Sequence, residues 1–314
     1  MAERRLFALL GLLALLSALF LGWGLREPAG FILSLRAVKL AALLVVGAAI
    51  GAATVMFQTV AANRLLTPGI VGFDALFVFL QTGLVLLLGG AGFATLPDLA
   101  KFGAELLCML LAGVALFGVM LRRGAEDVLR LVLTGVILGV FLRGLSGFAG
   151  RLLDPSEYSI VQQASFATFG TVDGTQLAIA AAVLAAALTG ARLLAPALDA
   201  AALGRTTARA IGLPFDRIAL LALVIVSACV AASTALVGPI TFLGLLAASL
   251  AHAVLRTWRH ALLIPGAAII GASILVAGQF VFERLLGQQS TLAVIVGCVG
   301  GLLFLFLVLR KSRP

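Results

Sequence analysis

The sequence predicts an all-α, polytopic membrane protein with ten transmembrane helices. Hydrophobic residues make up 62% of its 314 residues and charged residues only 11%, and the mean hydropathy is +1.21. Soluble domains carry about 25% charged residues, whereas a helix that crosses a bilayer needs about 20 apolar residues. Apolar runs of nearly this length recur along the whole chain. We therefore expect a single transmembrane domain over residues 1–314, and no ATPase within it, since the sequence has no phosphate-binding GxxxxGKS/T loop.

The apolar runs place the ten spans in order along the chain. Their predicted ranges are 6–24, 37–58, 74–91, 101–121, 130–150, 175–195, 217–236, 240–256, 262–283 and 291–309. No small-residue cleavage site follows the first run, so we expect a retained helix and not a signal peptide. The connection 151–175 is long enough for a short surface helix. The connection 195–217 is punctuated by glycine and proline and predicts one or two short helices.

Basic residues lie mostly at the span ends that share one side of the membrane with the N-terminus. Arg4 and Arg5 precede the first span, and Arg122 and Arg123 follow the fourth. Because cytoplasmic loops are enriched in Lys and Arg, this bias predicts that both termini are cytoplasmic. The net charge of +9 is scattered over these span ends. It therefore does not indicate nucleic-acid binding.

Small residues in three spans indicate faces for close helix packing. They occur as VVGAAIGAATVM in the second span, SACVAASTALVG in the seventh and PGAAIIGASILVAG in the ninth. Two similar links, TPGIVGFDAL and VGPITFLGLL, follow the second and the seventh span. Five spans separate them, which would place them on opposite membrane faces, as in an inverted repeat. The residue matches alone leave a chance similarity equally open.

Four blocks of the chain resemble, in the same order, motifs of the permease family of ABC importers for ferric siderophores, haem and vitamin B12. RAVKLAALLVVGAAIGAATVMFQ (36–58) resembles the family's R-L-P-R and VGAAL segment, and NRLLTPGIVGFD (63–74) its N-P-L-A-x-P-x-x-L-G loop. GRTTARAIGL (204–213) is similar to the A-R-S-L-G-V block, and GPITFLGLL (238–246) to G-P-I-G-F-V-G-L. The chain departs from most members at Ala248 and Ser249 and in GQFVFERLL (278–286). These departures resemble the sub-branch of iron-chelate permeases for catecholate-type siderophores.

The resemblance implies the type II ABC-importer permease architecture. The chain would be the transmembrane permease subunit of an ATP-driven importer that moves an iron–siderophore complex from periplasm to cytoplasm by alternating access. It would be a multi-pass protein of the bacterial inner membrane and no enzyme, with no cofactor of its own, because the partner ATPase uses the ATP. Expected partners are ABC ATPase subunits, a periplasmic or lipoprotein substrate-binding protein, and a second permease. A heterodimer is expected, and a homodimer stays open.

Two other functions remain as alternatives. Within the ABC importers, the substrate would be haem or a corrinoid. From a different class, an ion-coupled secondary transporter would need buried acidic residues in several spans, and this sequence offers few.

The polar link between the second and third spans is the predicted cytoplasmic gate. The resemblance assigns it to the inner mouth of the pathway, where Asn63, Leu65, Pro68 and Gly72 would form the gate and the pathway wall. Irregular backbone at membrane depth is tolerated only where protein or water satisfies its polar groups. A position facing the pathway therefore explains the polarity of this link.

Residues 197–216 are the predicted coupling-helix region, which in the family docks on the ATPase. Arg205, Thr207, Arg209 and Gly212 would lie at that contact. The alternative is a loop whose arginines only fix the membrane topology.

Three basic residues on the outer face are predicted to dock the binding protein. Arg36 and Lys39 fall on the two arginine positions of the R-L-P-R motif, which in the family meet acidic residues of that protein. Arg284 lies next to the third basic position, which an ungapped alignment gives to Glu283. Snorkelling of these side chains to the membrane interface is the alternative.

Arg143 and Glu105 are charged residues within predicted spans, which is a hint of function by default. Arg143 has no partner nearby in sequence, so it would either face the pathway and meet an anionic chelate or pair with an acid on another helix. Glu105 is predicted to pair with Lys101, four residues away on the same helix. His252 and His260 lack the spacing and the additional ligands of a metal site, so no metal site is expected.

Overall fold

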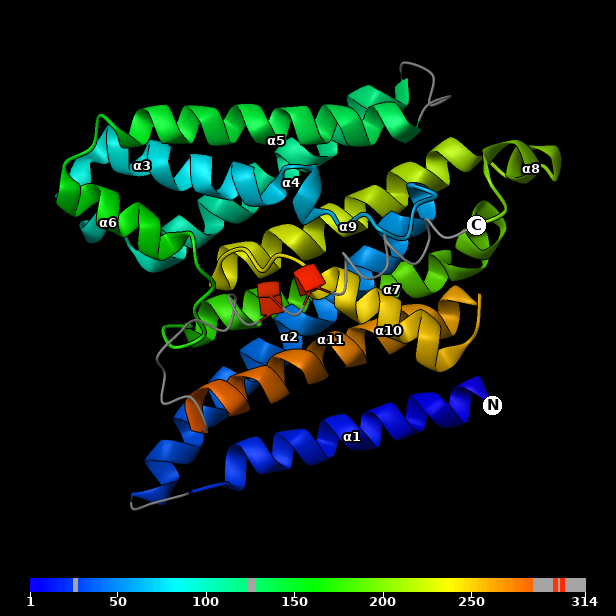
Figure 1. Ribbon diagram of the computed structural model, residues 1–314, viewed down its shortest axis with the longest axis horizontal. Coiled ribbons are helices and arrows are strands. Elements are labelled where there is room, and N and C mark those ends of the chain that lie inside the picture. The colour runs from blue at the N-terminus through cyan, green and yellow to red at the C-terminus, as the bar shows by residue number, and fades with distance from the viewer. Residues whose placement is uncertain (25–27, 123–127, 285–295, 299, 303–314) are drawn as a thin grey trace.

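The structure is a computed structural model that describes residues 1–24, 28–122, 128–284, 296–298 and 300–302. Every element in this part of the chain is helical, and the long helices run roughly side by side (Figure 1). Within the described residues, eight helices are long and apolar enough to cross a membrane. They are α1 (Ala2–Gly22), α2 (Ala29–Val60), α3 (Phe73–Thr95), α4 (Asp98–Arg122), α5 (Val128–Gly150), α7 (Gly174–Ala201), α9 (Phe215–Val237) and α11 (His260–Arg284).

Four shorter helices complete the described part of the chain. They are η1 (Gly69–Val71), α6 (Pro155–Ala164), α8 (Arg205–Ala210) and α10 (Leu243–Leu255). α6 and α8 occupy the two connections for which short helices were predicted. α10 has 13 residues, about 20 Å of helix, so it does not cross the membrane alone as the predicted span 240–256 would. The predicted span 291–309 lies largely outside the described residues.

α8 and α6 mark opposite ends of the helix bundle, which we call the α8 end and the α6 end (Figure 1). The N-terminus lies at the α8 end, where Arg5 donates to the carbonyl oxygen of Val254 at 2.8 Å. At the α6 end, the loop after α6 meets the end of α9, where the N–H of Thr168 donates to the carbonyl oxygen of Val237 at 2.8 Å. The helices therefore connect two distinct polar ends.

α2 packs more extensively against α11 than any other pair of helices does in the described part of the chain. A Cβ atom on Gly47 would lie 2.5 Å from the Cα of Ala272, and one on Gly51 would lie 2.2 Å from the carbonyl oxygen of Ala267. Helices in lipid associate through such close approach of small residues. The packing faces predicted in the second and ninth spans are thus confirmed.

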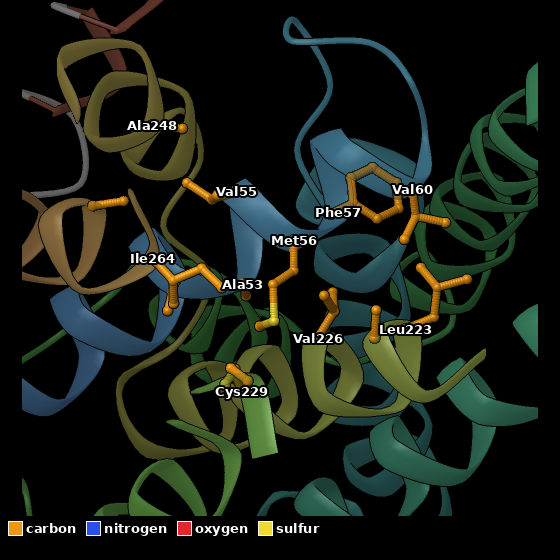
Figure 2. Packing of buried hydrophobic residues seen from close by; sticks show 14 of the residues in the cluster. Ala53, Val55, Met56, Phe57, Val60, Leu223, Val226, Cys229, Ala248 and Ile264 are labelled. Carbon is orange, nitrogen blue, oxygen red and sulfur yellow. The ribbon is translucent and has the colours of Figure 1, made fainter. Parts of the chain in front are cut away.

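The main apolar core forms where α2, α9, α10 and α11 meet (Figure 2). Met56 and Phe57 of α2 and Val226 and Cys229 of α9 are buried there without measurable exposure. α1 lies at the edge of the bundle against α11 and leaves most of its apolar side chains exposed. This arrangement suits a helix that faces lipid.

Candidate functional site

The first link, residues 61–72, turns back from the α8 end into the bundle. At its start, the side-chain amide of Gln58 donates to the carbonyl oxygen of Arg64 at 2.7 Å. At its end, Gly72 packs against the middle of α5, where a Cβ atom would lie 3.1 Å from the carbonyl oxygen of Gly135. Its φ of +109° also favours glycine. α3 therefore begins deep in the bundle and not at its end (Figure 1).

The second link, residues 238–242, enters the bundle from the α6 end and joins α9 to α10. Gly238 ends α9 with a φ of +95°. At the start of α10, a Cβ atom on Gly244 would lie 2.0 Å from Oγ1 of Thr54 in α2, so α10 begins inside the bundle. The two links thus enter from opposite ends, as the inverted-repeat hypothesis predicted.

The two links meet at a cavity of about 180 Å³. The first link contributes residues 67–70 and the second contributes 240–242. Four threonine side chains line the same cavity: Thr54, Thr67, Thr234 and Thr241. Polar side chains thus lie beside the irregular backbone here, and polar partners are the condition under which such backbone is stable at membrane depth.

Asp74 and Arg143 bring opposite charges to this cavity. The two side chains interact electrostatically, and in the described part of the chain Arg143 is exposed. Both also border a second cavity of about 460 Å³ beside Ser165 and Pro239. Arg143 thus borders two cavities and lies near an acid of another helix, and its role stays a prediction.

The four predicted gate residues do not lie together. Pro68 lines the cavity, and Gly72 is buried against α5. Asn63 and Leu65 lie nearer the α8 end, outside the cavity lining, and the side-chain oxygen of Asn63 accepts the N–H of Leu65 at 3.0 Å. Their role as a gate stays a prediction.

α8 is held on the first turn of α9 by one carboxylate that the sequence analysis missed. Asp216 pairs with Arg205 at 3.1 Å and also with Arg209. Arg205 is mostly covered, whereas the Arg209 side chain is half exposed. Thr207 and Gly212 are exposed beside it. The predicted coupling residues therefore share one surface at the α8 end.

The predicted coupling region begins inside α7. This helix continues past Pro196 to Ala201, so the first five residues of the predicted range 197–216 belong to a membrane-length helix. The sequence analysis ended this span at residue 195, whereas α7 accommodates Pro196 within the helix.

The three predicted docking residues lie together at the α6 end around Glu283. Lys39 Nζ lies 2.7 Å from Glu283 Oε1, and Arg284 is exposed within electrostatic range of Arg36. The Arg36 guanidinium also donates to the end of α1, at 2.8, 2.8 and 3.2 Å from the carbonyl oxygens of Leu21, Trp23 and Gly24. Arg36 therefore stabilises the C-terminus of α1 in addition to any docking role.

Glu105 hydrogen-bonds Gln81 of α3 and interacts with Lys101 only electrostatically, without a direct ion pair. The side-chain amide of Gln81 donates to Glu105 Oε1 at 2.7 Å, and Lys101 Nζ instead lies 3.3 Å from Asp98 Oδ1. Glu105 points into the bundle and is only 5% exposed, whereas the Asp98 side chain is 84% exposed. Lys101 thus forms its direct ion pair with the exposed acid and not with the buried one.

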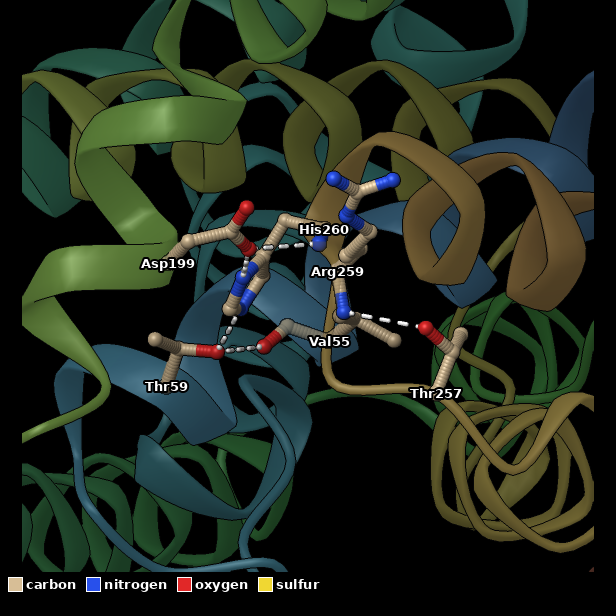
Figure 3. Close-up of polar contacts among 6 residues, drawn as sticks. All are labelled: Val55, Thr59, Asp199, Thr257, Arg259 and His260. Carbon is tan, nitrogen blue, oxygen red and sulfur yellow. Dashed lines mark hydrogen bonds and ion pairs between the residues drawn. The ribbon is translucent and has the colours of Figure 1, made fainter.

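A buried polar network at the α8 end joins three helices (Figure 3). His260 begins α11, and its Nδ1 lies 2.7 Å from Asp199 Oδ1 of α7. Its Nε2 lies 2.7 Å from Thr59 Oγ1 of α2. Sequence reasoning missed this network. The only signal was a polar residue at the end of each of three apolar runs.

Comparison with known proteins identifies relatives over nearly the whole chain. The FecCD transport family model matches residues 9–310. The petrobactin import system permease protein YclO of Bacillus subtilis (strain 168) is 35% identical, over 99% of this chain and 98% of that protein. The ferric enterobactin transport system permease protein FepD of Escherichia coli (strain K12) is 30% identical, over 90% of this chain and 83% of that protein.

A solved structure supports the fold. It is described as an inward-facing conformation of a metal-chelate type ABC transporter, and it superposes with a TM-score of 0.86 at 21% identity. The match covers 99% of this chain and 100% of the other.

Proposed function

Since the chain belongs to the FecCD transport family, we propose that it is the permease subunit through which an ATP-driven importer carries an iron–siderophore complex into the cytoplasm. The observation that carries this proposal is the match of the family over residues 9–310. Relatives that match nearly end to end are named as permeases for petrobactin and ferric enterobactin. The cargo is therefore a ferric siderophore of the catecholate or mixed type.

The pathway runs beside the cavity where the two links meet. The volume of this cavity, about 180 Å³, is below the roughly 300–1,000 Å³ of pockets that enclose drug-sized ligands. A complete pathway for a siderophore therefore needs a second permease, and the surface that carries the exposed Arg143 faces it. A ferric catecholate is an anion, so the Arg143 guanidinium attracts it. Asp74 limits that attraction, which lets the cargo leave.

The α8 end faces the cytoplasm in this proposal, and the α6 end faces the outer side of the bacterial inner membrane. The N-terminus and the arginines of α8 share the α8 end, as the positive-inside rule requires of cytoplasmic segments. ATPase subunits dock on α8 through Arg205, Thr207, Arg209 and Gly212. A substrate-binding protein docks at the opposite end on the basic cluster Arg36, Lys39 and Arg284.

The test is transport by the assembled importer in proteoliposomes. The chain is expressed with the ATPase, permease and binding-protein genes of its own operon, and uptake of radioactive iron is measured with an iron-loaded catecholate siderophore. We expect uptake that requires ATP and the binding protein. Haem and cobalamin serve as competing cargoes. Uptake of one of these and not of the siderophore would reassign the substrate, and uptake driven by an ion gradient without ATP would refute the importer class.

A further inference from the structure

His260 joins the end of α7, which precedes α8, to the end of α2, which precedes the first link. α7 ends two residues after Asp199, and the next residues lead directly into α8. α2 ends one residue after Thr59 and continues into the first link. His260 contacts both residues and is itself the first residue of α11. One side chain therefore connects three helix ends that are far apart in the sequence (Figure 3).

The positions of the hydrogen atoms make this connection continuous. Oδ1 of Asp199 accepts the backbone N–H of His260 at 2.7 Å and also faces the ring Nδ1 at 2.7 Å. A carboxylate oxygen only accepts hydrogen bonds, so Nδ1 carries a hydrogen. The Thr59 hydroxyl has one hydrogen and two acceptors in reach, Nε2 at 2.7 Å and the carbonyl oxygen of Val55 at 2.9 Å. The hydroxyl donates to the ring or accepts from it, and either arrangement ties the ring to α2.

The network resists being pulled apart. His260 is only 3% exposed, and it borders a cavity of about 430 Å³ whose other lining side chains are apolar apart from Arg192. A buried ring nitrogen that lost its partner would be left without a hydrogen bond, which makes the loss costly. The ends of α2, α7 and α11 therefore move together more readily than separately.

We propose that His260 is a positioning residue that transmits movement of α8 to the first link. This inference rests on the proposed function, in which the ATPase moves α8 and the first link opens the cytoplasmic mouth. Displacement of α8 shifts the end of α7, and His260 passes that shift to the end of α2. Asn63 and Leu65, three and five residues after Val60, move with it. The network thus couples α8 to the first link, although the two are far apart in the sequence.

A purely structural role is the rival explanation. Asp199 also satisfies the first N–H of α11, as an N-cap residue does. If this were the whole role, loss of the network would lower the amount or the stability of the folded protein. It would leave the number of siderophores carried per ATP unchanged.

The decisive variant is Thr59→Val, which keeps the shape of the side chain and removes the hydroxyl. Thr59→Ser restores the hydroxyl, and Thr82→Val is the matched control, because Thr82 is buried and its hydroxyl bonds only the carbonyl oxygen of Val78 in its own helix. Iron uptake and ATP hydrolysis are measured on the same proteoliposomes of the complete importer. We expect uptake per ATP to fall about tenfold in Thr59→Val, the typical weight of one hydrogen bond in an equilibrium. Thr59→Ser and Thr82→Val should behave as wild type.

A second readout does not depend on the cargo. Hydrogen exchange of α8 and of residues 61–66 is compared with and without ATP in the assembled complex. We expect ATP to change exchange in both segments of the wild type and only in α8 of Thr59→Val. His260→Asn, whose shorter side chain keeps the Asp199 contact but does not reach Thr59, should reproduce this result if Thr59→Val fails to fold.

Two results would overturn the inference. One is a first link that still responds to ATP in both variants. The other is a parallel loss of uptake, ATP hydrolysis and folded protein, which indicates a structural role only. A wild-type complex that carries no siderophore would refute the proposed function, while the exchange experiment would still decide the role of His260.

Discussion

Arg209 and Arg205 are the same residue type four positions apart, yet their surroundings give them different tasks. Arg205 is mostly covered and pairs with Asp216, which is sufficient to hold α8 on α9. The Arg209 side chain pairs with the same carboxylate but is half exposed. An exposed ion pair contributes little, about 0–1 kcal/mol. Arg209 is therefore available to a partner protein at small cost to the fold.

This difference leads to a prediction for ATPase docking. Arg209→Asp should weaken association of the permease with its ATPase by about tenfold, because it reverses a charge at the contact. Arg209→Gln removes the charge without reversing it and leaves the Arg205–Asp216 pair in place, so it should weaken docking by a smaller factor. Co-purification in mild detergent and a titration of ATPase binding measure the effect, with membrane insertion as the control. Wild-type affinity in Arg209→Asp would remove Arg209 from the docking contact.

A second residue-scale prediction separates Arg284 from Arg36. Arg284 is exposed and free to meet an acidic partner, so Arg284→Gln should slow association with the binding protein several-fold at low salt, and the effect should fade at high salt. Arg36→Gln should instead lower the thermal stability of the permease at any salt concentration, because three carbonyl oxygens at the end of α1 lose their donor. Stopped-flow binding and thermal unfolding test the pair. Equal association rates for wild type and Arg284→Gln at low salt would remove Arg284 from the docking surface.

At the scale of elements, the contact of α2 with α11 depends on glycine. A side chain on Gly51 would collide with a backbone oxygen at 2.2 Å, and backbone cannot rotate away. Gly51→Val should therefore cost more than the ~1–3 kcal/mol typical of overpacking and strongly reduce folded protein. Gly11→Val is the control, because nothing lies within 4 Å of a Cβ atom at Gly11 in α1. Thermal unfolding in detergent and the yield after size-exclusion chromatography test this prediction. Wild-type values for both variants would refute it.

The elements also show which features the sequence can and cannot predict. Long spans were predicted correctly because the length of an apolar run is a local property. The eighth predicted span began three residues before α10, because Ile240 and Phe242 are apolar although they belong to the second link. Motifs located the basic residues, but their acidic partners Asp216 and Glu283 lie on other helices. Such contacts depend on how helices pack, and spacing along one helix does not contain that information.

At the scale of the whole molecule, two irregular links from opposite ends converge on one cavity that four threonines help to line. Each is anchored by glycine at a positive φ, Gly72 in one and Gly238 in the other. Each link is also continuous with a different end of the bundle. Under the proposed function, a movement at one end would open one link while the other stays closed, as alternating access requires.

The orientation of these two ends in the membrane is the last prediction. Thr206 in α8 and Ser156 in α6 are both exposed, and they lie at opposite ends of the bundle. We expect Ser156→Cys to react with a membrane-impermeant maleimide from outside the cell, and Thr206→Cys to react only once the membrane is opened. The background must lack the exposed Cys108 and Cys298, while the buried Cys229 can remain. The physical reason is that arginines such as Arg5 and Arg209 share the α8 end and are retained on the cytoplasmic side. The reverse labelling pattern would invert the topology, and it would place α8 beyond the reach of an ATPase.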